Sequence, residues 1–264
     1  MKRSRLAATG AAVLATLMFA SACVQKPAAT DTPTPTKPAM QMLTDAADKT
    51  KGQSFKYTLT YGEILTGTGT RDDKGNATRD ITVKTGANGL SIVAKIMSIV
   101  GDRIFAKLDL GAFGAAVPGL GNVGDRWMVV NGSRLNPNSL SASLVPTADS
   151  STVDSFVKGV VTAENVSATE VKGTVDLTKG ATPVALPASE MAKLTPEQKV
   201  VAFTATLDSQ GRMVKTVVNM PAVAGYPAAP LTTTYSDFGS VITITMPPEY
   251  QSVDAPETIY LLLP

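Results

Sequence analysis

The chain contains no histidine, only one cysteine and few aromatic residues, and these absences exclude several kinds of chemistry. Without histidine, a Ser-His-Asp or Cys-His catalyst and a His-ligated zinc site are impossible. The sequence also contains no Gly-x-Ser-x-Gly elbow and no phosphate-binding Gly-Lys-Ser/Thr loop. We therefore expect a protein that is not an enzyme and that has no cofactor and no metal site.

The single cysteine, Cys23, lies at the end of a leader-like segment. Basic residues near the start precede an apolar run from Leu6 to Phe19, and the small residues Ala20-Ser21-Ala22 lead into the thiol. The run is too short to span a bilayer core of ~30 Å permanently, so it predicts a cleaved signal peptide, residues 1–22. The cleavage motif resembles a lipobox, which predicts lipidation of Cys23; an ordinary secretory signal is the alternative.

A lipidated Cys23 predicts an extracytoplasmic protein anchored to the cell membrane, because a two-chain anchor binds a membrane stably. Lipidation also leaves no free thiol for a disulfide, a nucleophile or a metal site. The formal charge is +2, but three of the basic residues lie in the leader, so the remainder carries about −1. No Lys/Arg run remains that would indicate nucleic acid binding.

Residues 23–39 comprise the cysteine and a Pro/Thr-rich tether that favours extended, disordered conformations. Residues 40–264 then predict one folded domain. Residues 40–51 have helical periodicity, with Met40, Leu43, Ala46, Ala47 and Thr50 expected on the buried face. Two further helices are predicted, at 152–161 and at 189–193.

Alternating polar and apolar residues predict about ten strands joined mostly by tight turns, which favours an antiparallel meander. The predicted strands are 55–61, 64–71, 78–85, 90–99, 103–108, 126–130, 199–208, 213–220, 231–238 and 241–246. The segment from Leu110 to Val123 is uncharged and rich in Gly and Ala. It predicts either a loop folded onto the core or a movable flap over an apolar site.

Several blocks of this sequence resemble the LppX/LprAFG family of bacterial lipoproteins, within the wider LolA/LolB-like group. They are residues 100–107, 123–128, 171–176, 207–213 and 234–247, the last of which contains Tyr235-Ser-Asp-Phe-Gly and ends in Pro247. The resemblance implies an α+β half-barrel, in which a large curved antiparallel sheet has a few helices over its concave face. It also implies an apolar cavity that holds the acyl chains of a lipid or lipoglycan.

The function implied is lipid binding and transport across the cell envelope, with an acyl lipid, glycolipid or lipoglycan as ligand and a membrane transporter as a possible partner. The alternative is a non-enzymatic interaction or sensor lipoprotein that uses the same fold to contact a protein. Strand phase alone selects the candidate cavity lining: Phe55, Tyr57, Leu59, Ile92, Ala94, Ile96, Phe113, Val117, Val201, Phe203, Ala205, Val214 and Val218.

Overall fold

A computed structural model describes residues 37–85, 90–99, 103–135, 152–179, 188–223 and 227–262. Residues from Thr36 onward belong to one compact unit. The expected signal peptide, Cys23 and most of the expected tether lie outside the described residues.

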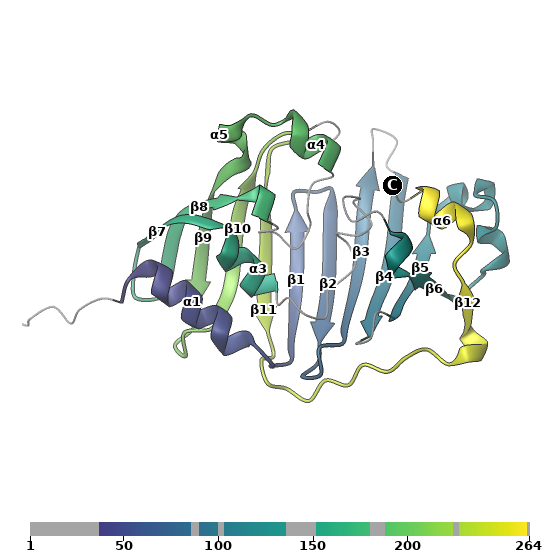
Figure 1. Cartoon of the computed structure of the whole chain (residues 1–264), viewed down its shortest axis with the longest axis horizontal. Helices are drawn as coiled ribbons and strands as arrows, with labels where there is room; N and C mark the ends of the chain where they lie inside the picture. Colours follow the sequence, from purple (N-terminus) through teal and green to yellow (C-terminus); the bar gives the residue numbers. More distant parts are fainter. Residues whose placement is uncertain are drawn as a thin grey trace, which may run out of the picture. The chain divides into compact units, whose positions relative to one another are not determined.

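The described residues form a mixed α+β fold around one largely antiparallel, open sheet of twelve strands (Figure 1). The strands are β1 (Phe55–Tyr61), β2 (Leu65–Arg71), β3 (Ala77–Thr85), β4 (Leu90–Ile99), β5 (Arg103–Asp109), β6 (Trp127–Asn131), β7 (Val160–Asn165), β8 (Glu170–Asp176), β9 (Val200–Leu207), β10 (Met213–Met220), β11 (Ala229–Ser236) and β12 (Ser252–Asp254).

The strand order is β12-β6-β5-β4-β3-β2-β1-β11-β10-β9-β8-β7. Two meanders, β1–β6 and β7–β11, therefore join through the antiparallel pair β1–β11. The short strand β12 pairs with β6 in parallel and forms one edge of the sheet, while β7 forms the other.

The described helices are short and few. They are α1 (Ala39–Thr50), η1 (Gly111–Ala116), η2 (Leu120–Asn122), η3 (Gly132–Arg134), α3 (Thr152–Gly159), η4 (Leu177–Lys179), α4 (Ala188–Lys193), α5 (Pro196–Lys199), η5 (Glu249–Gln251) and α6 (Glu257–Leu262). The three helices expected from sequence are confirmed with small shifts of their ends. On α1, however, Met40 is 41% exposed, and Met42 is buried instead.

One face of the sheet carries apolar side chains across most of its width, and we call it the apolar face. Its register can be followed through Leu59, Gly67, Ile81, Ala94 and Leu108, each directly opposite the next on neighbouring strands. Directly opposed residues point to the same side of a sheet. Both buried clusters described below therefore lie on this face.

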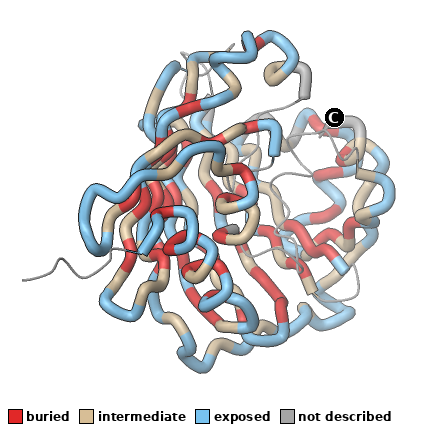
Figure 2. Tube along the Cα trace, turned by 60° about the vertical axis from the view of Figure 1, so that its left-hand side comes forward, coloured by how far each residue is buried: buried red, intermediate tan, exposed pale blue. Residues whose placement is uncertain are grey.

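The larger cluster is covered by two helices. Helix α1 contacts β7, β10 and α3, and α3 contacts β8 (Figure 1). Leu43 and Ala46 of α1 and Val153 and Phe156 of α3 are buried against the sheet, with Phe156 meeting Phe203 edge-on at a 5.0 Å ring separation. In Figure 2 the buried positions recur along these strands and on the helices above them.

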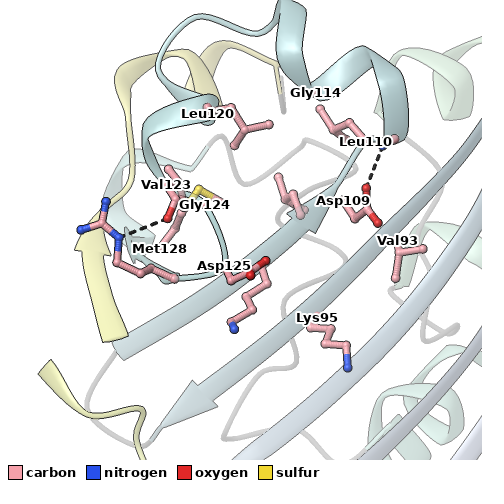
Figure 3. Close-up of a pocket in the computed structure, with 15 residues that line it drawn as sticks. Val93, Lys95, Asp109, Leu110, Gly114, Leu120, Val123, Gly124, Asp125 and Met128 are labelled. Atoms are coloured by element: carbon pink, nitrogen blue, oxygen red, sulfur yellow. Dashed lines mark hydrogen bonds between the residues drawn. The ribbon is translucent and has the colours of Figure 1, made fainter. Parts of the chain in front are cut away.

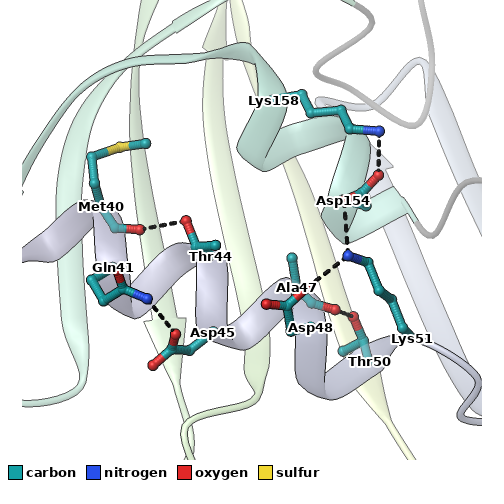
Figure 4. A network of polar contacts seen from close by, with 10 residues as sticks. All are labelled: Met40, Gln41, Thr44, Asp45, Ala47, Asp48, Thr50, Lys51, Asp154 and Lys158. Atoms are coloured by element: carbon teal, nitrogen blue, oxygen red, sulfur yellow. Dashed lines mark hydrogen bonds and ion pairs between the residues drawn. The ribbon is translucent and has the colours of Figure 1, made fainter.

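A chain of charged side chains links the outer sides of these two helices (Figure 4). The ammonium of Lys51, the residue after α1, lies 2.7 Å from Asp48 of α1 and 4.0 Å from Asp154 of α3. Asp154 also pairs with Lys158 at 2.6 Å. Exposed pairs of this kind contribute less than about 1 kcal/mol each. The apolar contacts beneath them are therefore what hold α1 and α3 on the sheet.

The smaller cluster lies on β4, β5 and β6. Ala94, Ile104 and Met128 are buried there under Leu120 of η2 and Ile259 of α6. Helix α6 is fixed to its surroundings by polar contacts as well: the hydroxyl of Tyr260 accepts a hydrogen bond from the N–H of Asn131 at 2.9 Å. This half of the sheet is thus covered by single turns of helix.

Strand β2 permits an unusually close contact near the junction of the two clusters. A Cβ placed on Gly69 would lie only 2.2 Å from the ring of Tyr57, so the ring occupies the space that a side chain would need. The Tyr57 hydroxyl accepts a hydrogen bond from Nε of Arg79 at 2.9 Å, and Arg79 is 3% exposed. A buried guanidinium therefore lies on a largely apolar face, and it donates to the phenol across β2.

The prediction of a strand at 241–246 is wrong. After β11, residues Asp237–Gln251 run as an extended connection past the ends of β1–β6 to reach β12 (Figure 1), and we call this segment the strap. Seven strand spacings of ~4.8 Å separate β11 from β12, or about 34 Å along the sheet. Fifteen residues reach at most about 50 Å, so a largely extended strap can cover this distance, and it does so without joining the ladder of the described strands.

Candidate functional site

The candidate site is a pocket of about 500 Å³ at the β4–β6 end of the sheet (Figure 3). Its volume is within the ~300–1,000 Å³ range of small-molecule sites. The lining comprises Val93, Lys95, Lys107, Leu108, Asp109, Leu110, Gly111, Gly114, Leu120, Gly121, Val123, Gly124, Asp125, Arg126 and Met128.

The pocket exists because β5 is longer than the ladder that it shares with β6. The β5–β6 register ends at the pair Ala106 and Met128, whereas β5 continues to Asp109 beside Val93 of β4. The chain between the two strands does not extend the ladder but folds into η1 and η2. Gly119, with φ 83°, makes the turn between these two helices.

The floor of the pocket is apolar. Leu120, Val123 and Met128 are 8%, 5% and 0% exposed, and Leu110 packs beside them. The segment from Leu110 to Val123 therefore both folds onto the core and forms a wall of the pocket. Its movement as a flap stays a prediction.

The rim of the pocket is charged. Lys95 and Lys107 lie directly opposite each other on β4 and β5, and Lys95 also lies 3.7 Å from Asp80. The ammonium of Lys107 lies 5.2 Å from the centre of the Trp127 ring. The guanidinium of Arg126 donates to the carbonyl oxygens of Asn122 and Val123.

Two carboxylates share this rim with the three cations. Asp109 accepts a hydrogen bond from the N–H of Gly111 at 2.8 Å, which fixes the start of η1. Asp125 lies in the turn before β6 and makes no ion pair within the described part of the chain. An apolar floor beneath a rim of both charges suits a ligand with an apolar body and a polar end.

The residues predicted to line a cavity occupy other positions. Phe55, Tyr57, Leu59, Val201, Phe203, Ala205 and Val218 belong to the larger cluster, and Ala94, Ile96 and Val117 belong to the smaller one. Ile92 and Val214 are half-buried, and Val214 lies at a bulge in β10. The backbone of Phe113 lies in η1, but its side chain is outside the described part.

Phe113 aside, none of these residues lines the pocket at β4–β6. The segment from Leu110 to Val123, expected to be a loop or a flap, does contribute to the lining, whereas the charged rim and Met128 were not among the predicted residues. Part of the rim could have been predicted from the two lysines on successive predicted strands. Like charges opposite each other destabilise a strand pair, so their presence there suggests a role other than stability. The floor could not be found this way, since Leu120 and Val123 lie in short helical turns with no sequence period.

One spacing of catalytic interest occurs on α3, where Ser155 and Lys158 match Ser-x-x-Lys. The side chain of Lys158 is 70% exposed and pairs with Asp154 at 2.6 Å. A lysine that acts as a base must be desolvated and kept from a carboxylate, because both conditions favour the neutral amine. The spacing therefore does not form a catalytic pair here.

Among the described residues, no three acidic, histidine or cysteine side chains gather in a way that could bind a metal ion. The described helices include none that is both long and apolar enough to cross a membrane.

No protein-family model and no curated protein matches this chain. A search of solved structures found a DUF1329 family protein from Desulfovibrio piger, with 10% sequence identity and a TM-score of 0.26. The alignment covers 78% of this chain and 93% of that one. At that TM-score the likeness supports no argument about this protein.

Proposed function

We propose that this protein is an extracytoplasmic lipoprotein, anchored through Cys23, that binds a lipid or lipoglycan and carries it across the cell envelope. The observation that carries the proposal is the pocket at β4–β6, which combines an apolar floor with a charged rim. An acyl chain would occupy the floor, and the polar end of the ligand would remain at the rim.

The proposal also concerns the type of fold and the protein family. We propose that the open sheet is the half-barrel of the LolA/LolB-like group, and that α1 and α3 cover its concave face. Supporting this view are the shared apolar face and the position of both helices on it. The resemblance to the LppX/LprAFG lipoproteins adds a membrane transporter as the possible source of the cargo.

The energetics of lipid transfer favour a pocket of this kind. A two-chain lipid has about 30 methylenes, each worth ~0.8 kcal/mol on leaving water, so about 24 kcal/mol opposes free diffusion. A carrier replaces the bilayer with a comparably dry site, and only the difference between the two determines loading and release. A pocket that is partly open at a charged rim permits both.

The test is native mass spectrometry with lipid extraction on the chain carrying Cys23→Ser, which removes the proposed anchor. We expect acyl lipid to copurify at close to one per protein from a host of the native type. A protein that stays lipid-free after incubation with phospholipid and glycolipid would contradict the proposal.

A variant that fills the pocket sharpens this test. Gly121 lines the pocket, and a Cβ at this position meets no heavy atom within 4 Å. Gly121→Trp should therefore place an indole in free space and reduce the bound lipid severalfold, whereas Gly121→Ala should leave it unchanged. Equal lipid in both variants would mean that the ligand lies outside this pocket.

A further inference from the structure

The strap is an extended segment that pairs with no strand among the residues that the structure describes. Its start is fixed to Ser54, whose carbonyl oxygen accepts from the N–H of Gly239 at 2.9 Å and whose hydroxyl donates to the carbonyl of Ser240. From Val241 to Pro247, no backbone N–H or C=O makes a hydrogen bond to another described residue. An edge of free backbone groups is therefore open to pairing.

The sequence of the strap has the composition of a pairing strand. Residues 241–246 read Val-Ile-Thr-Ile-Thr-Met, all but the last β-branched, and no charge occurs from Phe238 to Pro248. Six-residue segments with high β-propensity, no charge and no proline or glycine are those that pair with copies of themselves. Pro247 and Pro248 then end the segment, because proline has no N–H to donate.

Side-chain exposure shows which side of the strap is available. Val241 is 99% exposed, and Thr243 and Thr245 are exposed with it, whereas Ile242 and Ile244 are half-buried. Beneath the start of the strap is a cavity of about 630 Å³, lined also by the 72–74 turn and Arg212. The strap is therefore packed only lightly against the domain, and a second strand can lie beside it without displacing buried residues.

No described strand lies alongside the strap. Its residues cross from β11 to β12, so it runs past the strand ends of the sheet (Figure 1). A strand of another molecule is therefore the partner that we consider. A second copy presents an identical free strand, and neither copy carries a charge that would repel the other.

We propose that two copies of this protein associate through their straps, with residues 241–246 of each forming an antiparallel two-stranded ribbon. This inference is independent of the lipid-binding proposal. A ribbon of six residues is short, so the dimer is weak and concentration-dependent. If the strap instead bound a bilayer or an extended peptide of another protein, that result would contradict the proposed dimer.

The first measurement is sedimentation equilibrium of the Cys23→Ser chain over a range of concentrations. Thr243→Pro removes one N–H from each copy, and this N–H makes no hydrogen bond within the described chain. The fold should therefore be kept, while ribbon formation should be weakened by about tenfold or more, because the ribbon loses two donors. The matched control, Thr243→Val, retains the N–H and should dimerise at least as well as the parent.

A crosslink locates the contact. In the Cys23→Ser background, Thr243→Cys should give an oxidised dimer, whereas Thr169→Cys, exposed in the β7–β8 turn, should not. A chain that stays monomeric, a dimer unaffected by Thr243→Pro, or a monomer that binds neutral phosphatidylcholine vesicles through the strap would each overturn the proposal. Should Thr243→Pro fail to fold, Thr245→Lys provides the same test by placing like charges on the two straps.

Discussion

The two halves of the sheet are covered in different ways. On β7–β11 and β1, α1 and α3 cover the apolar face, and large side chains such as Phe156 and Phe203 meet directly. On β4–β6 the cover consists of η1, η2 and α6, which are three to six residues long. A helix of two or three turns presents a continuous apolar side, whereas single turns leave gaps between them. The comparison teaches that the half with the shorter covering elements is also the half in which the β5–β6 ladder stops early and leaves a pocket.

The largest expected effect is in the half covered by α1 and α3. Phe203→Ala removes a buried ring that contacts Phe156, so it should lower the free energy of unfolding by about 3–5 kcal/mol. Urea unfolding followed by circular dichroism measures this loss. A loss below 1 kcal/mol would show that this half is not the tightly packed one.

The matching change in the other half should cost less. Leu120→Ala removes a buried side chain at the wall of a pocket, where fewer neighbours are lost, and we expect about 2 kcal/mol. The same urea titration compares the two variants directly. If Leu120→Ala were the more damaging, the cover over β4–β6 would have to be the better packed of the two.

A third change tests the junction of the two clusters. Gly69→Ala inserts a methyl group where the ring of Tyr57 now lies, so the ring and its hydrogen bond to Arg79 must shift. We expect a loss of about 1–3 kcal/mol, typical of overpacking. Tyr57→Phe in the same background separates the steric part from the hydrogen bond, because it removes the hydroxyl alone. A stable Gly69→Ala variant would mean that the ring has room to move.

The smallest expected effect is a loss of stability at low pH, which should be greater in the half of the sheet that contains carboxyl groups with lowered pKa values. Partial burial raises the pKa of Asp208, but hydrogen bonds from the N–H and side chain of Arg212 and from the N–H of Gln210 outweigh it and keep that pKa below its usual range. A carboxyl with a lowered pKa stabilises the fold above about pH 4, and this contribution is lost as the pH falls through the folded-state pKa.

Asp176, with a pKa lowered by its hydrogen bonds from Thr178, lies in the same half, in β8. Hydrogen exchange at pH 3 should therefore show β8–β10 losing protection relative to β4–β6. Asp208→Asn should remove about 1 kcal/mol of stability at pH 7 and reduce the dependence on pH. Equal loss of protection in both halves would contradict the comparison.

Sequence reasoning predicted the strands whose polar and apolar residues alternate, and β1, β9 and β10 are found where expected. It missed β7 and β8 because exposed residues such as Val161 and the mixed pattern around Gly173 obscure the period of two. The strand prediction for the strap was wrong for the opposite reason. Its alternation of apolar and polar residues is clear, but the segment has to connect β11 with β12 at the far edge of the sheet. A local sequence pattern contains no information about that connection.

The candidate site was the least predictable part. Strand phase selected residues such as Leu59 and Ala205, which lie in the larger buried cluster and not at the pocket. The pocket instead depends on where the β5–β6 ladder stops, and this is a property of two strands and the 110–126 connection together. Lys95 and Lys107 were visible in the sequence, but only the register places them opposite each other.

The parallel pair β12–β6 has a consequence for how the protein is made. Ser252 pairs with Trp127, two residues far apart along the chain, so this contact forms late compared with the hairpins on either side. During synthesis the strands from β1 to β11 emerge before the strap, β12 and α6 do. A nascent chain can thus complete most of the sheet while the β4–β6 edge is still uncovered, and β12 and α6 close that edge afterwards.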